Sequence, residues 1–100
     1  MKEIYKEVRK INKLDPASHA ERLGKLYEES GELATEVNKT NGRKKHKNSE
    51  KEIKQNIIEE SADVIQNVFS LVDGFGVTYD EIIEALQKKN EKWKKKIENK

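Results

Sequence analysis

Apolar residues recur every three or four positions along most of the chain, which is the period of an α-helix. They divide the sequence into a short N-terminal segment that ends near Leu14 and three longer segments, the second of which runs to about Lys39. Asp15-Pro16 ends the first segment and marks the start of the second, because proline is tolerated at the first position of a helix. Strand-like alternation is essentially absent. The sequence therefore predicts an all-α helical bundle with three main helices and a short N-terminal helix.

Polar residues mark the start of each longer helix. Each start carries a serine or threonine followed three positions later by a glutamate, the pattern of a capping box. The three pairs are Ser18 with Glu21, Ser49 with Glu52, and Thr78 with Glu81. Asn41-Gly42 and Gly74-Phe75-Gly76 supply the breaks, since glycine can adopt the left-handed conformation that ends a helix. We expect the lysine-rich end of the last helix to fray.

The apolar arc of the third predicted helix covers about half of its circumference, which is more than a helix covered on one side normally carries. Its members are Ile57, Ile58, Val64, Ile65, Val68, Phe69, Leu71 and Val72. We expect this helix to be buried on two sides, either wholly within the monomer or between its own bundle and a second subunit. In the second case a homodimer or homotetramer would complete the bundle.

Length and composition limit the class of protein. The 100 residues are expected to form a single domain spanning 1–100, with a basic loop at 41–48 and a lysine-rich C-terminal tail. The absence of cysteine excludes disulfides and thiolate metal sites. No apolar run is long enough to cross a membrane, and the N-terminus does not lead into the apolar core of a signal peptide. A soluble, cytoplasmic protein without a membrane partner is expected.

The distribution of charge matters more than its total, because 40% of the residues are charged while the net charge is only +2. Basic residues gather at Arg43 to Lys47 and from Lys88 to Lys100, with acidic groups between them. Basic flanks around an acidic, metal-loaded centre would suit a polyphosphate ligand, and ordinary solvated surface charge is the alternative. We expect Arg43 to Lys47 to belong to a mobile loop. No helix carries a basic face interleaved with aromatic residues, which disfavours nucleic acid as a partner.

One acidic pattern occurs twice, each time beside an apolar stripe. Glu28-Glu29-Ser30-Gly31-Glu32 returns as Glu59-Glu60-Ser61-Ala62-Asp63. Residues three apart on a helix lie about 5–6 Å apart at Cβ, so Glu29/Glu32 and Glu60/Asp63 each offer two oxygen ligands to one small volume. Carboxylates this close repel one another unless a divalent cation neutralises them. The repeat predicts a Mg²⁺ site, in which Mn²⁺ could substitute, and glutamates on a solvated face are the alternative.

This repeat resembles the signature of the MazG-like, all-α nucleoside triphosphate pyrophosphohydrolases. The similarity rests on Glu28-Glu29-x-x-Glu32 followed by Glu60-x-x-Asp63, and it covers roughly Leu23 to Trp93. Gly31-Glu32-Leu33 and Ala62-Asp63-Val64-Ile65 match the surroundings of the signature. The resemblance implies a Mg²⁺-dependent enzyme that cleaves a nucleoside triphosphate between its α and β phosphates, releasing the monophosphate and pyrophosphate. Members usually serve in house-cleaning or in control of nucleotide pools.

The resemblance also implies roles for individual acids. By motif position, the metal ligands would be Glu29, Glu32, Glu60 and Asp63, while Glu28 would support the cluster or orient water. These five residues form the predicted catalytic group. Attack by a metal-activated water on the α phosphorus is the implied chemistry.

Substrate contacts are implied less completely. A lysine and an asparagine on the last helix of the family often reach the nucleotide, and Lys89, Asn90 and Trp93 resemble that region. The pattern departs because Leu86 stands one turn before Asn90 and no arginine precedes Trp93. Trp93 is therefore also open to interpretation as a core or interface residue. Asn67 is either a ligand contact or an amide on the helix surface.

A different class of function stays open at this point. A basic, oligomeric helical bundle could act without catalysis as a nucleotide sensor, or as an interaction module for a protein or a nucleic acid. The acids would then be solvated surface or interhelical pairing groups.

Overall fold

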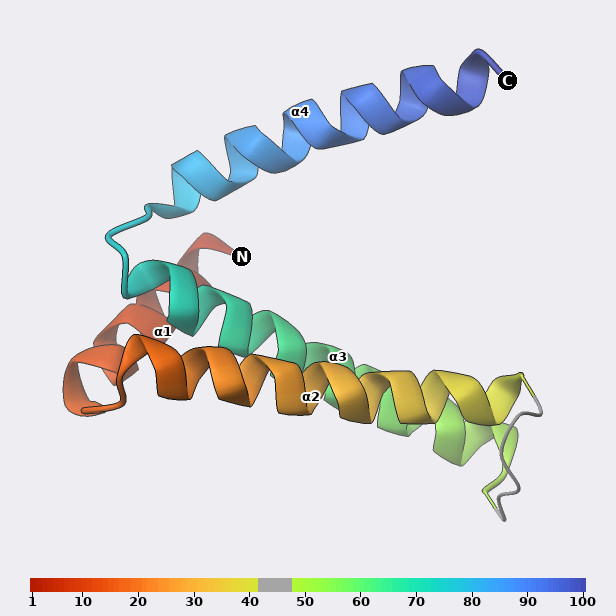
Figure 1. The fold of residues 1–100 in the computed structure, drawn as a ribbon, viewed down its shortest axis with the longest axis horizontal. Helices are drawn as coiled ribbons and strands as arrows, with labels where there is room; N and C mark the ends of the chain where they lie inside the picture. Colours follow the sequence, from red (N-terminus) through yellow and green to blue (C-terminus); the bar gives the residue numbers. More distant parts are fainter. Residues whose placement is uncertain (42–47) are drawn as a thin grey trace.

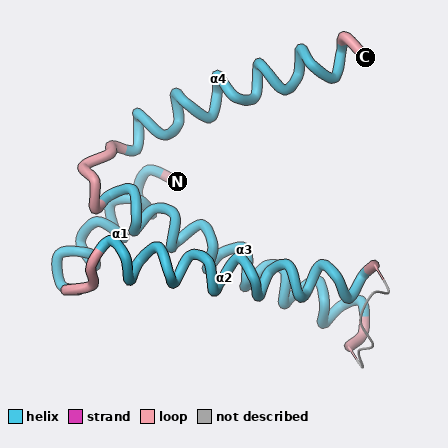
Figure 2. The backbone as a smooth tube through the Cα atoms, viewed as in Figure 1, coloured by secondary structure: helices cyan, strands magenta, loops and turns pink. Residues whose placement is uncertain are grey.

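The computed structural model describes residues 1–41 and 48–100, and these residues form four helices and no strand (Figures 1 and 2). The helices are α1 (Lys2–Leu14), α2 (His19–Thr40), α3 (Glu50–Asp73) and α4 (Tyr79–Glu98). The predicted all-α fold class is confirmed. The predicted loop at Arg43 to Lys47 lies outside the described residues.

The α2/α3 pair is the centre of the fold. α3 runs back along α2, and α1 packs against α3 near the start of α2 (Figure 1). Ile53 of α3 is buried, and Glu29 of α2 is the one buried polar residue of the described chain. The packing that forms the hairpin therefore also encloses a carboxylate.

A small aromatic core joins α1, α3 and the start of α4. It consists of Tyr5, Val8 and Phe69, with Val72 and Tyr79 packed against it. The ring of Tyr5 meets that of Phe69 edge-on at a centroid distance of 5.0 Å, a favourable aromatic geometry. The Tyr5 hydroxyl donates a hydrogen bond to the carbonyl oxygen of Val77. This core fixes one end of the bundle.

Polar contacts around Asn12 hold α1 to α3 beside that core. The amide nitrogen of Asn12 donates to Ser70 O at 2.8 Å and to Asp73 Oδ2 at 3.0 Å, while its oxygen accepts from Ser70 Oγ at 2.7 Å. Arg9 pairs with Asp73 at 3.4 Å from the solvent side. Since both ends of the Asn12 amide are bonded, α1 is fixed in one position along α3.

The helix starts follow the predicted caps with one difference. Both hydrogen bonds of the capping box are present in two pairs, Ser18 with Glu21 and Thr78 with Glu81. At the third start, Ser49 Oγ accepts from the Glu52 amide, but the Glu52 carboxylate accepts from Asn48 Nδ2 at 3.0 Å and from Ser49 Oγ at 3.3 Å. The prediction of a complete capping box is wrong there, because Asn48 competes for the carboxylate.

One glycine uses the left-handed conformation expected at a break. Gly76 has φ +76°, whereas Gly74 keeps a right-handed helical φ of −60° at the end of α3. The turn into α4 therefore depends on Gly76. Gly42 lies outside the described residues.

α4 departs from the other helices after its start, and the gap widens toward the C-terminus (Figures 1 and 2). None of its residues is buried, and Leu86, Trp93 and Ile97 are more than half exposed. Its lysine-rich end is helical as far as Glu98, and the expected fraying of the last residues stays a prediction. Lysine and glutamate are good helix formers, which accounts for the extension.

The apolar arc of α3 is only partly covered within the chain. α2 lies against one side and α1 against another, yet Ile58 and Ile65 are 52% and 45% exposed. Burial of α3 wholly within the monomer is therefore wrong. No helix of the described residues has both the length and the apolarity needed to span a membrane.

Replacing Tyr5 with phenylalanine tests the core that fixes the bundle. Tyr5→Phe removes the partly buried hydrogen bond to the carbonyl oxygen of Val77, so the free energy of unfolding should fall by about 1 kcal/mol. Tyr27→Phe is the matched control, because Tyr27 is 70% exposed, and it should change stability by less than about 0.5 kcal/mol. Urea denaturation of wild type and both variants measures the free energies of unfolding. A Tyr5→Phe protein as stable as wild type would contradict the role of the Tyr5 hydroxyl in fixing the bundle.

Candidate metal centre

Packing of α2 against α3 brings three carboxylates together. One oxygen each of Glu29, Glu60 and Asp63 lies within 4.8 Å of the others. Glu60 and Asp63 are neighbours on α3 because residues three apart share a helix face, and Glu29 reaches them from α2. The centre therefore depends on the pairing of the two helices.

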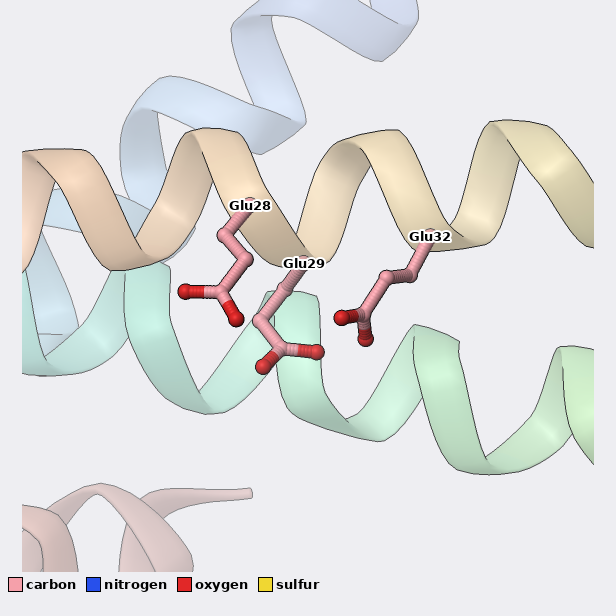
Figure 3. Close-up of side chains that lie close together, drawn as sticks. All are labelled: Glu28, Glu29 and Glu32. Atoms are coloured by element: carbon pink, nitrogen blue, oxygen red, sulfur yellow. The ribbon is translucent and has the colours of Figure 1, made fainter.

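A second acidic group overlaps the first on α2. Glu28, Glu29 and Glu32 each offer an oxygen within 4.8 Å of the others, and their side chains project from α2 across the face of α3 (Figure 3). Glu28 and Glu32 are exposed, whereas Glu29 is 6% exposed. The structure thus brings all five sequence-predicted acids into two groups that share Glu29.

Two of these carboxylates carry buried oxygens without a partner. Glu29 Oε2 and Glu60 Oε2 are buried and accept no hydrogen bond from the described residues. A buried carboxylate oxygen without a donor or a cation is unfavourable. Oxygen-only ligands are also the set that Mg²⁺ prefers. On both grounds, the residues present fit a divalent cation.

Lys25 is the residue that the sequence predictions missed. Its Nζ lies 3.1 Å from Glu29 Oε1 and 3.6 Å from Glu28 Oε1. Among the described lysines, arginines and histidines, no other forms an ion pair with the five acids. The available sequence signal was the position of Lys25 one helical turn before the acidic pattern.

Proton and charge are distributed unevenly over the cluster. Burial, followed by the neighbouring Glu32 and Glu29, raises the pKa of Glu60 to about 7. The hydrogen bond from Lys25 is the largest influence on Glu29 and lowers the pKa of that carboxyl despite its burial. Glu29 therefore keeps its negative charge while Glu60 retains a proton well above the usual range of a glutamate.

Asn67 lies next to the cluster but is bonded within its own helix. Its Nδ2 donates to the carbonyl oxygen of Asp63 at 2.7 Å. It also lines a cavity of about 180 Å³ between α1 and α3. The structure thus places Asn67 one turn beyond Asp63, with its amide nitrogen engaged.

The remaining predicted substrate residues are not brought to the acids within one chain. Lys89, Asn90 and Trp93 are exposed on α4, which leads away from α2 and α3 (Figure 1). Trp93 is 66% exposed. Their contact with a nucleotide at the acidic cluster would need a second copy of the chain or a different position of α4.

Comparison with known proteins identifies the class to which this all-helical chain belongs, the all-α NTP pyrophosphatase-like superfamily, which includes MazG. Within it, residues 2–90 match the phosphoribosyl-ATP pyrophosphohydrolase family, and the chain belongs to that family. The uncharacterized protein YvdC of Bacillus subtilis (strain 168) is 42% identical over 72 residues, covering 68% of each chain. No solved structure gives a significant match.

The raised pKa of Glu60 predicts a specific pH dependence in EDTA. Its ordinary value is 4.5, so between about pH 4.5 and about pH 7 the folded protein binds this proton more tightly than the unfolded chain does. The contribution of Glu60 to the free energy of unfolding should therefore fall as pH rises through this range. Glu60→Gln should remove that fall and be the more stable protein above pH 7.

Urea denaturation at about pH 5 and about pH 8 measures this effect. Glu59→Gln is the matched control, because Glu59 is the exposed neighbour on α3, and it should keep the wild-type pH dependence. If the free energy of unfolding of Glu60→Gln kept the wild-type pH dependence, the raised pKa would not belong to Glu60.

Proposed function

We propose that the protein is a Mg²⁺-dependent nucleoside triphosphate pyrophosphohydrolase of the MazG-like kind, which converts an NTP or dNTP to the monophosphate and pyrophosphate. The main support is the meeting of Glu29, Glu60 and Asp63, from two helices, around buried oxygens that lack a partner. Membership of a pyrophosphohydrolase family adds the reaction type. House-cleaning or control of nucleotide pools is the corresponding cellular role.

The acids would divide the work as follows. The residues that would hold the metal are Glu29, Glu32, Glu60 and Asp63. A bound Mg²⁺ supplies positive charge for the phosphate oxygens and a water of lowered pKa. Glu28, exposed at the edge of the cluster, orients the attacking water through its carboxylate. No side chain forms a covalent bond to phosphorus in this scheme.

A groove beside the acids offers room for the rest of a nucleotide. It lies between α1 and α3, has a volume of about 360 Å³, and includes Asp63 in its lining. Most of the lining is apolar, with Val8, Ile11 and Phe69 among its members. This volume is in the range of small-molecule sites, so a base could enter the groove while its phosphates meet the acids.

A homodimer, or a homotetramer built from it, is the proposed assembly. Apolar side chains without cover support it, namely Ile58 and Ile65 of α3 and Leu86, Trp93 and Ile97 of α4. A second copy lying along α4 would cover them and could bring Lys89 and Asn90 to the partner's nucleotide. Light scattering should then give a multiple of the 11.6 kDa chain mass, and a monomer at micromolar concentration would contradict this assembly.

Phosphoribosyl-ATP is the second candidate substrate, because the family match carries its name. Its hydrolysis breaks the same type of phosphoanhydride bond, so the acidic centre alone does not separate it from ordinary nucleotides.

Product analysis with canonical and modified triphosphates and phosphoribosyl-ATP, in Mg²⁺ and in EDTA, distinguishes these substrates. Monophosphate and pyrophosphate should appear only with Mg²⁺. Diphosphate and orthophosphate, or no turnover by the folded protein, would contradict the proposal, and no turnover would favour a sensor.

Asp63→Asn and Glu32→Gln test the metal ligands directly. Each removes a negative charge at nearly constant size, so turnover should fall by at least about 100-fold while helicity stays unchanged. Glu59→Gln removes the same charge from the exposed side of α3 and should keep turnover within about twofold of wild type. Initial rates of pyrophosphate release and far-UV circular dichroism provide the comparison. A wild-type rate of pyrophosphate release in Asp63→Asn would contradict the assignment of Asp63 as a metal ligand.

A further inference from the structure

The ammonium of Lys25 lies at the edge of the acidic cluster, 3.1 Å from one oxygen of Glu29. It contacts both Glu28 and Glu29, and Glu29 is the residue that the two acidic groups share. The other oxygen of Glu29 and one oxygen of Glu60 remain buried and without a partner. One ammonium therefore offsets part of the negative charge and leaves the remainder uncompensated.

This contact differs from an ordinary ion pair on a helix surface. The Lys88–Glu84 pair of α4 has a similar separation of 3.2 Å, but its side chains are 73% and 69% exposed. In the Lys25–Glu29 pair, the lysine is 51% exposed and the glutamate only 8%. Lysine also precedes glutamate, which is the less favourable order for helix stabilisation. The stability of α2 alone gives little reason for this pair.

The two partners would respond differently to an incoming divalent cation. Lys25 can swing its ammonium into water because half of its side chain is already exposed. Glu29 cannot follow, because it is held between α2 and α3. A cation bound by Glu29 would also repel the ammonium 3.1 Å from its oxygen. Exchange of the lysine for the metal is therefore the easier rearrangement.

We propose that Lys25 is an internal counter-ion, which stabilises the cluster without metal and is displaced from Glu29 when a divalent cation binds. The inference rests on the proposed metal-dependent function and adds a regulatory role for this lysine. It requires one substitution to have two opposite effects. Removing the charge should destabilise the protein in EDTA and strengthen metal binding.

Lys25→Met tests both effects, since methionine keeps the length of the aliphatic stem without its charge. The loss of the free Mn²⁺ signal in electron paramagnetic resonance measures binding, and the variant should bind Mn²⁺ at least about fivefold more tightly than wild type. Its melting temperature in EDTA should be lower than that of wild type. Lys88→Met is the matched control from the exposed pair of α4, and it should change neither quantity.

Lys25→Arg is a second variant, which keeps the positive charge. It provides a test even if Lys25→Met does not fold. It should bind Mn²⁺ no more tightly than wild type. Equal affinities of Lys25→Met and wild type, or tighter binding by Lys25→Arg, would overturn the counter-ion role while leaving the metal site intact. Absence of Mn²⁺ binding in all of these proteins would overturn the counter-ion role together with the metal-dependent function.

Displacement itself has a direct signature in the Nζ resonance of Lys25, assigned by its loss in Lys25→Met. Saturation with Mg²⁺ should move this ¹⁵N resonance in wild type, since the contact between the Lys25 ammonium and Glu29 is broken. A resonance that keeps its position while Mg²⁺ is bound would overturn the proposal.

Discussion

Repulsion between carboxylates is the constraint on which this molecule depends. The packing of α2 against α3 holds Glu29, Glu60 and Asp63 within 4.8 Å of one another, so the contact that forms the hairpin also concentrates negative charge. Three agents can offset that charge: a proton, a lysine and a metal. The lysine is present in the ion pair of Lys25 with Glu29, and burial with the neighbouring acids favours a proton by raising the pKa of Glu60. The third is the basis of the proposed enzyme.

The rest of the fold supports this arrangement from one end. The core around Tyr5 and the bonded amide of Asn12 fix α1 on α3, near the point where α2 begins. Acids carried on two packed helices keep their relative positions better than acids on loops, as a site for phosphate chemistry requires. α4 is anchored only at its start and presents its apolar residues to solvent. One chain therefore supplies an acidic centre, whereas the residues implied for nucleotide contact lie on α4, none of whose residues is buried.

The sequence predicted the parts of this structure that depend on local order. The apolar period located the helices, serine and threonine marked their starts, and the repeat located the five acids, because each signal lies within a few residues. Contacts between segments were not available in the same way. The helical period placed Glu29 beside the apolar stripe and Glu28 away from it, in agreement with their burial, but nothing in the sequence showed that Asn48 competes for Glu52 or that α4 departs from the bundle. Lys25 was missed for the same reason, since its importance comes from the burial of its partner by α3.

Anomalous diffraction from crystals grown with Mn²⁺ tests the central claim most directly, because it locates the cation without reference to turnover. The account predicts a manganese peak bounded by Glu29, Glu60 and Asp63, with Lys25 turned away from Glu29. Full occupancy of Mn²⁺ at another position, or no peak among these carboxylates at saturating metal, would contradict it.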